Sequence, residues 1–122
     1  MSDAQLTPFD ASAFEKLLSN ADASVLSPLF DRALQSIQEF ANSGDLDFAA
    51  AQFSAHKLKT TCLQLGLSRL ANILQSVEQS ARNSDQARYD ALKRMFDSEF
   101  TNVEKSLKEY GQKLRLSITT GQ

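Results

Sequence analysis

The chain has 122 residues, of which 42% are hydrophobic and 23% charged, and this ordinary globular composition excludes an intrinsically disordered protein. A formal net charge of −2 argues against a nucleic-acid partner. The one cysteine, Cys62, excludes an internal disulfide and fits a reducing compartment. Neither a secretory signal nor an apolar run near the roughly 20 residues that cross a bilayer is present, so we expect a soluble, cytoplasmic protein without a membrane partner.

At this length we expect one domain over residues 1–122, with a bundle core over about 24–114 and loosely ordered ends at 1–10 and 117–122. Short breaks rich in helix-capping residues separate one short helix from four longer ones. The predicted helices cover, in chain order, about 11–19, 25–41, the segment from its N-cap Asp45 to Gly66, 68–82 and about 84–114. Short loops between four amphipathic helices predict an all-α, antiparallel up-down-up-down four-helix bundle, to which the short first helix is an extra N-terminal element.

The last predicted helix carries apolar side chains seven residues apart, at Tyr89, Phe96, Val103 and Tyr110. This heptad-like pattern is typical of one long helix in a bundle. The same pattern leaves one alternative open, a structural helical protein that dimerises through this helix as a coiled coil. The helix would then need a second apolar face, one for the core and one for the partner. We expect a monomer.

The only histidine, His56, lies in the third predicted helix, inside a stretch from Phe48 to Val77 that contains no acidic residue. Imidazole is the one side chain that titrates near neutrality without help, and its neutral form is a nucleophile toward phosphoryl groups. At about 100° per residue, His56 points away from the core face of its helix. That face consists of Ala51, Ala55, Leu58, Cys62 and Leu65. The alternative, a histidine hydrogen-bonded inside the core, does not fit this phase.

Several neighbours share the exposed side of the third helix or its flank. Lys59 and Thr60 follow His56 by about one turn, and Gln52, Phe53 and Leu63 lie on the same side or its edge. Apolar side chains rimmed by lysines around a reactive imidazole predict a docking surface for a partner. The alternative is that the first helix covers the two apolar side chains, or that they are simply exposed.

Other chemistries lack the residues that they require. A zinc site needs three or four ligands, and His56 and Cys62 stand about 120° apart on their helix, so no metal site is predicted. No nucleophile-elbow sequence and no glycine-rich phosphate loop is present. Cys62 lies on the core face and is expected to be a small buried hydrophobe. An independent enzyme is therefore not expected.

The segment His56-Lys57-Leu58-Lys59, with Leu65-Gly66 at the end of the same helix, resembles the histidine-containing phosphotransfer (HPt) domains of multistep two-component phosphorelays. Glu78 and Arg82 match a second family element on the following helix, an acid or amide followed four residues later by a base. The resemblance covers about residues 20–112. One departure is Thr60, which stands where the family frequently has glycine.

This resemblance implies that the chain accepts a phosphoryl group from a receiver-domain aspartate and passes it to another receiver, without catalytic activity of its own. His56 would carry the group, Lys59 would stabilise its oxygens, and Lys57 would add to the local positive field. Glu78 would orient the imidazole, and Arg82 would pair with Glu78 or contact the partner. Partners would be receiver domains of response regulators or a hybrid histidine kinase. The chain would need no cofactor, because Mg²⁺ is expected on the receiver.

Two alternatives stay open. Glu78 and Arg82 fit equally a plain pair on a helix surface, which stabilises by a few tenths of a kcal/mol. The chain as a whole fits a helical binding module that docks a receiver or a partner helix and regulates it without phosphotransfer. Thr60 favours that module, and the intact His-x-x-Lys sequence favours phosphotransfer.

Overall fold

The computed structural model describes residues 9–17, 22–44 and 47–119. These residues form five helices and no strand, so the all-α prediction is confirmed. The helices are α1 (Ala11–Leu17), α2 (Ala23–Ala41), α3 (Phe48–Gln64), α4 (Ser68–Arg82) and α5 (Gln86–Thr119). None of these helices is long and apolar enough to cross a membrane.

Some predicted helix boundaries were wrong. The N-cap of α3 is Asp47, whose side chain accepts a hydrogen bond from the Ala50 N–H at 2.7 Å. Asp45, predicted for this role, lies outside the described residues. Likewise, α2 begins at Ala23, two residues before the predicted start, because the carboxylate of Asp22 accepts from the backbone N–H of Ser24 at 3.0 Å.

The two ends of the chain are more regular than predicted where they are described. Residues 117–119, which we expected to be loosely ordered, continue α5 as a helix beyond its predicted end near residue 114. At the other end, the Asp10 N–H donates to the Gly66 carbonyl at 2.9 Å. Residues 1–8 and 120–122, on which the rest of these predictions falls, lie outside the described residues, and so do residues 18 and 19 at the predicted end of the first helix.

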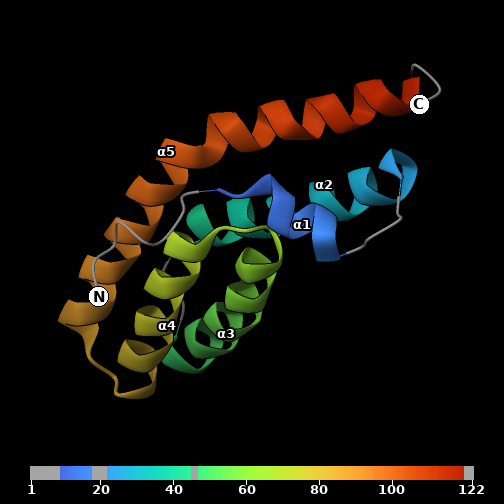
Figure 1. Cartoon of the computed structure of the whole chain (residues 1–122). Coiled ribbons are helices and arrows are strands. Elements are labelled where there is room, and N and C mark those ends of the chain that lie inside the picture. The colour runs from blue at the N-terminus through green and yellow to red at the C-terminus, as the bar shows by residue number, and fades with distance from the viewer. Residues whose placement is uncertain (1–8, 18–21, 45–46, 120–122) are drawn as a thin grey trace.

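Figure 1 shows α3 and α4 as an antiparallel hairpin, with the N-terminal half of α5 beside α4. The C-terminal half of α5 continues past this hairpin and lies next to the N-terminal half of α2. Two aromatic contacts join α2 to α5 along their length, since Phe40 lies 5.1 Å from Phe96 and Phe30 lies 5.0 Å from Tyr110 between ring centroids. The helices therefore pack as the predicted antiparallel bundle.

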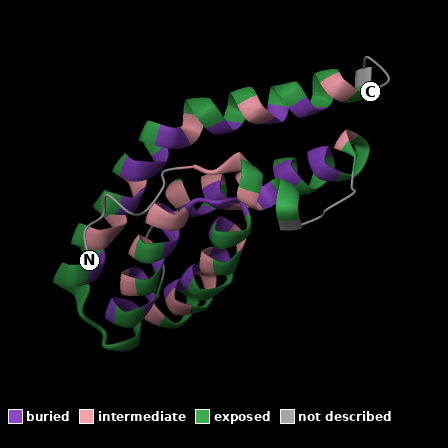
Figure 2. Ribbon diagram, in the orientation of Figure 1, coloured by how far each residue is buried: buried purple, intermediate pink, exposed green. Residues whose placement is uncertain are grey.

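The buried residues of the long helices belong to one hydrophobic core cluster, and Figure 2 colours the ribbon at these residues purple. On α5 the heptad positions Tyr89, Phe96 and Val103 are buried in this core, and the fourth, Tyr110, is partly buried against it. Burying the heptad residues stabilises the bundle through the hydrophobic effect, and it removes them from any coiled-coil contact with a second chain. The monomeric state stays a prediction.

Gly66 ends the helix that carries the histidine and allows the N-terminal segment to cross it. Its φ of +75° lies in the left-handed region, and the Leu67 N–H donates to the Cys62 carbonyl at 2.8 Å, which closes the helix end. A Cβ at Gly66 would lie 2.1 Å from the Asp10 carbonyl oxygen. The sequence Leu65-Gly66 therefore provides both the turn into α4 and the close contact that holds the segment before α1 against the hairpin.

Candidate phosphotransfer site

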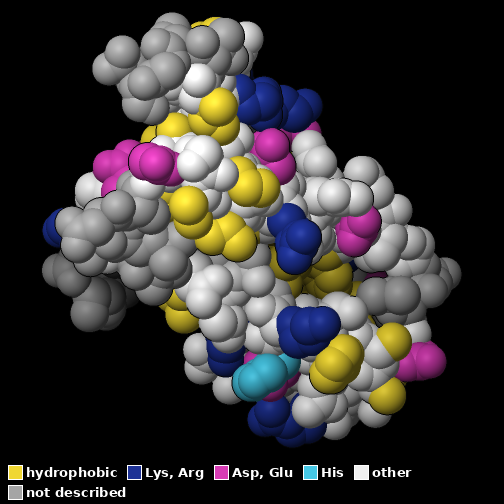
Figure 3. Space-filling model, turned by 90° about the vertical axis from the view of Figure 1, so that its right-hand side faces the viewer, with side chains coloured by type: hydrophobic (Ala, Val, Ile, Leu, Met, Phe, Trp, Pro, Cys, Tyr) yellow, Lys and Arg dark blue, Asp and Glu magenta, His cyan; other side chains and the backbone are white. Residues whose placement is uncertain are grey.

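The imidazole of His56 stands on the outer side of α3. Its side chain is 64% exposed, as the helical phase predicted. The predicted core face, made of Ala51, Ala55, Leu58, Cys62 and Leu65, is fully buried or nearly so. Figure 3 shows the histidine at the surface among lysine and arginine side chains. The structure therefore excludes a core histidine.

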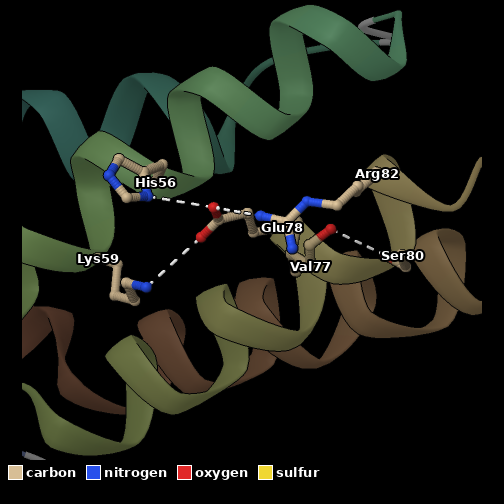
Figure 4. A network of polar contacts seen from close by, with 6 residues as sticks. All are labelled: His56, Lys59, Val77, Glu78, Ser80 and Arg82. Carbon is tan, nitrogen blue, oxygen red and sulfur yellow. Dashed lines mark hydrogen bonds and ion pairs between the residues drawn. The ribbon is translucent and has the colours of Figure 1, made fainter.

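Glu78 reaches this imidazole from the neighbouring helix. It follows Val77, which is fully buried, so its side chain stands at the edge of the buried stripe of α4 and points toward α3. The Glu78 side chain is only 9% exposed, and its Oε2 lies 3.1 Å from Nδ1 of His56 (Figure 4). The bond joins residues 22 positions apart in the chain, and it depends on the antiparallel pairing of α3 with α4.

Two cations also contact the same carboxylate. Lys59 Nζ lies 3.5 Å from Oε1 of Glu78, and Arg82 Nη2 lies 3.1 Å from Oε2 (Figure 4). A carboxylate taken out of water needs such partners, because a buried charge without them is strongly destabilising. Glu78 thus joins both helices, and it is not half of a plain surface pair.

The carboxylate fixes which imidazole nitrogen is free. An ionised carboxylate only accepts hydrogen bonds, so the Nδ1 that faces Glu78 carries the proton in the neutral ring. The lone pair is then on Nε2, the ring nitrogen that points away from Glu78 in Figure 4. The arrangement can therefore present a neutral, oriented nitrogen nucleophile to a group that arrives from solvent.

The predicted docking residues are found on the same outer side of α3. Phe53 is 64% exposed and Leu63 is 55% exposed, and Gln52 is half-buried. The alternative that the first helix covers Phe53 and Leu63 is therefore wrong. That helix packs elsewhere, since Phe14 contacts Phe30 at a centroid distance of 5.6 Å.

Lys57 and Thr60 complete the predicted set. Lys57 Nζ lies 5.2 Å above the ring of Phe53, within the range of a cation–π contact, so its charge is held on the flank of α3 away from Glu78. Thr60 is exposed on the same helix, one turn beyond His56. Among the described residues the imidazole ring forms a hydrogen bond with the Glu78 side chain, and none with the Thr60 hydroxyl.

A groove of about 330 Å³ lies between α2 and α3, beside this face, and sequence reasoning missed it. It is lined by Ser36, Glu39 and Phe40 of α2, by Ser43 just beyond the end of that helix, and by Phe53, Ser54, Lys57, Leu58 and Thr61 of α3. Ser36, Glu39 and Ser43 recur at intervals of three or four residues, and this spacing is the only sequence signal for the wall on the α2 side. The pairing of that wall with α3 is a property of the folded chain.

Neither a metal site nor a reactive thiol is found among the described residues. No group of three or more His, Cys, Asp or Glu side chains among them is placed to hold a metal ion. Cys62 is fully buried, and burial raises the pKa of its thiol to about 12. A thiol that stays protonated is a poor nucleophile and a poor metal ligand. Cys62 therefore belongs to the core, as predicted.

Comparison with known protein families agrees with this geometry. The sequence profile of the Hpt domain family matches residues 13–101, which cover most of the chain and include all of α3 and α4. The chain therefore belongs to the Hpt domain family, whose members are phosphotransfer modules of two-component signalling. Comparison with curated proteins gives no significant match, and neither does comparison with solved structures.

Proposed function

We propose that this protein is a phosphorelay intermediate that carries a phosphoryl group on His56 between receiver domains. The observation that supports this most strongly is the pairing of a 64% exposed imidazole with a buried carboxylate, 3.1 Å from its Nδ1. A histidine in a plain surface role needs no such partner. A histidine that acts as a nucleophile needs one, because the bond at Nδ1 keeps Nε2 unprotonated.

The transfer step follows from that tautomer. The lone pair of Nε2 forms the new N–P bond, while the P–O bond to the receiver aspartate breaks and its electron pair returns to the aspartate carboxylate. The proton stays on Nδ1, so no proton needs to leave the site. The reverse sequence delivers the group to a second receiver. Such transfers depend mostly on positioning and charge stabilisation, which a stiff bundle provides.

Lys59 and Arg82 both contact Glu78, the partner of the imidazole. In the proposal, Lys59 stabilises the phosphoryl oxygens, and Arg82 holds Glu78 in place or contacts the receiver. His56 lies on an exposed helix face, so the receiver must bring the acidic pocket and the Mg²⁺ that assist the reaction. The chain itself then needs no cofactor and no independent catalytic activity.

The docking surface in this proposal consists of Phe53, Leu63 and Gln52, around the imidazole. The lysines nearby complement an acidic receiver, which would raise the rate of encounter at low salt. We further propose that the protein is a cytoplasmic monomer, and that its partners are receiver domains of response regulators or of a hybrid histidine kinase.

The test mixes the chain with phosphorylated receiver domains and follows the label. We expect wild type to gain a label that is labile in acid and stable in base, as phosphohistidine is, and His56→Gln to gain none. Equal labelling of both proteins would remove His56 from the relay. The alternative, a docking module without phosphotransfer, predicts that receivers bind both proteins and label neither.

A further inference from the structure

The groove between α2 and α3 carries one charge of each sign. Glu39 lines it from α2 and Lys57 lines it from α3. Neither takes part in an ion pair among the described residues, for Glu39 accepts only from its neutral neighbour Gln35 at 3.3 Å, and Lys57 lies over an aromatic ring. Both charges are therefore available to a partner.

Glu39 is unusual for its position. The stretch from Phe48 to Val77 contains no carboxylate, and the face around His56 is positive. Glu39 brings an exposed negative charge to the border of this face from another helix. A partner that is acidic throughout its contact surface would be repelled there, because like charges brought together across an interface disfavour binding.

Lys57 and Phe53 connect the groove to the histidine. Phe53 lines the groove and is also a docking residue, and Lys57 lies over its ring next to His56 in the chain. The floor of the groove is apolar, since it consists of Phe40 and Leu58. A protein docked on the imidazole would therefore continue into the groove without leaving the surface.

We propose that this groove selects the receiver, an inference that rests on the proposed phosphotransfer. The receiver it fits places an apolar side chain against Phe53 and the groove floor, with a basic group opposite Glu39 and an acidic group opposite Lys57. Such a receiver is acidic at its phosphorylated aspartate and basic beside it. A uniformly acidic receiver is rejected, so opposite charges on the two walls provide specificity that the imidazole alone cannot.

The experiment uses the full chain and a panel of phosphorylated receiver domains, and continues with the receiver that labels wild type fastest. Initial transfer rates are measured against receiver concentration for wild type, Glu39→Lys, Glu39→Gln and Glu109→Lys. Glu109 is exposed on α5 and does not line the groove, so Glu109→Lys changes the net charge equally at another place.

We expect Glu39→Lys to raise the half-saturating receiver concentration about tenfold at unchanged maximal rate, and Glu39→Gln to raise it by a smaller factor in the same direction. Glu109→Lys should match wild type. If Glu39→Lys also matches wild type, or lowers only the maximal rate, the groove does not select the receiver, although phosphotransfer by His56 stands. If no receiver labels wild type, the proposed function and this inference are both wrong.

Discussion

Nδ1 of His56 and Oε2 of Glu78 lie 3.1 Å apart across the interface of α3 and α4. The His56 side chain is 64% exposed and the Glu78 side chain 9% exposed, so the bond links an imidazole that faces solvent to a carboxylate in the packed part of the bundle. An orienting partner that is itself immobilised holds a functional side chain more tightly than one that moves in solvent.

The first prediction concerns this bond. Glu78→Gln keeps the size of the side chain but removes its charge, so the amide can meet Nδ1 with either its oxygen or its nitrogen. We expect transfer to slow by roughly tenfold to a hundredfold, the range for loss of a partner that orients a metal-bound histidine. The chain has one histidine, so its ring nitrogens give an unambiguous ¹⁵N NMR signal. The signal should show Nδ1–H in wild type and a mixture of tautomers in Glu78→Gln. Identical tautomers in both proteins would contradict the positioning role.

Lys59 provides the second prediction. Its ammonium, 3.5 Å from Oε1 of Glu78, is the lysine charge that contacts the site. A hydrogen bond to a charged group contributes about 1.5–3 kcal/mol, so Lys59→Ala should slow transfer about tenfold or more, with an unchanged helical circular dichroism spectrum. Lys105→Ala, on the exposed side of α5, is the matched control. A rate equal to that of the control would remove Lys59 from the mechanism.

The third prediction uses Thr60, which is exposed one turn beyond the imidazole. If its bulk is what distinguishes it from the glycine frequent in the family, Thr60→Gly should transfer as fast as wild type or faster. Glycine is the poorer helix former, so the variant should also lose roughly 0.5 kcal/mol of stability in urea unfolding. Slower transfer at retained helicity would instead assign the threonine side chain a positive role.

Gly66 gives a prediction about stability. Gly66→Ala places a Cβ in the left-handed region and 2.1 Å from the Asp10 carbonyl oxygen. The conformational cost of about 1–2 kcal/mol and a weakened hydrogen bond to Asp10 of about 1 kcal/mol together predict a loss of about 2–3 kcal/mol in urea unfolding. Gly44→Ala is the control, since Gly44 has no atom within 4 Å of a Cβ there, and it should be neutral or slightly stabilising. Equal midpoints for the two variants would contradict the contact.

Cys62 gives the pH prediction. Burial raises the pKa of its thiol from 9.0 to about 12, so the folded chain holds this proton more tightly than the unfolded chain. Its contribution to stability is fully present below pH 9 and is lost as the pH rises from 9 toward 12. Cys62→Ala should therefore show a shallower alkaline loss in urea unfolding than wild type. Burial and a hydrogen bond to Glu15 also raise the pKa of Tyr110, so some of the loss should persist. An identical slope for both proteins would contradict this prediction.

A feature of the site can be predicted from the sequence when it depends on the phase of one helix, and much less well when it depends on how two helices pack together. The exposure of His56 follows from the phase of a single helix, and the structure agrees. The bond from Glu78 depends on how α3 pairs with α4, and only the family spacing indicated it. The groove at Glu39 depends on the placement of α2 against α3, for which the sequence holds no signal. Asp45 and Asp47 are equivalent as capping residues, so only the backbone geometry distinguishes them.

The central claim is that Nε2 of His56 carries the phosphoryl group. The most direct measurement labels the imidazole with ¹⁵N, phosphorylates the chain with a receiver, and records the coupling between phosphorus and nitrogen by NMR. We predict a one-bond coupling to Nε2, with the Nδ1 proton retained toward Glu78. A coupling to Nδ1, or phosphate on any other residue of the chain, would contradict the claim.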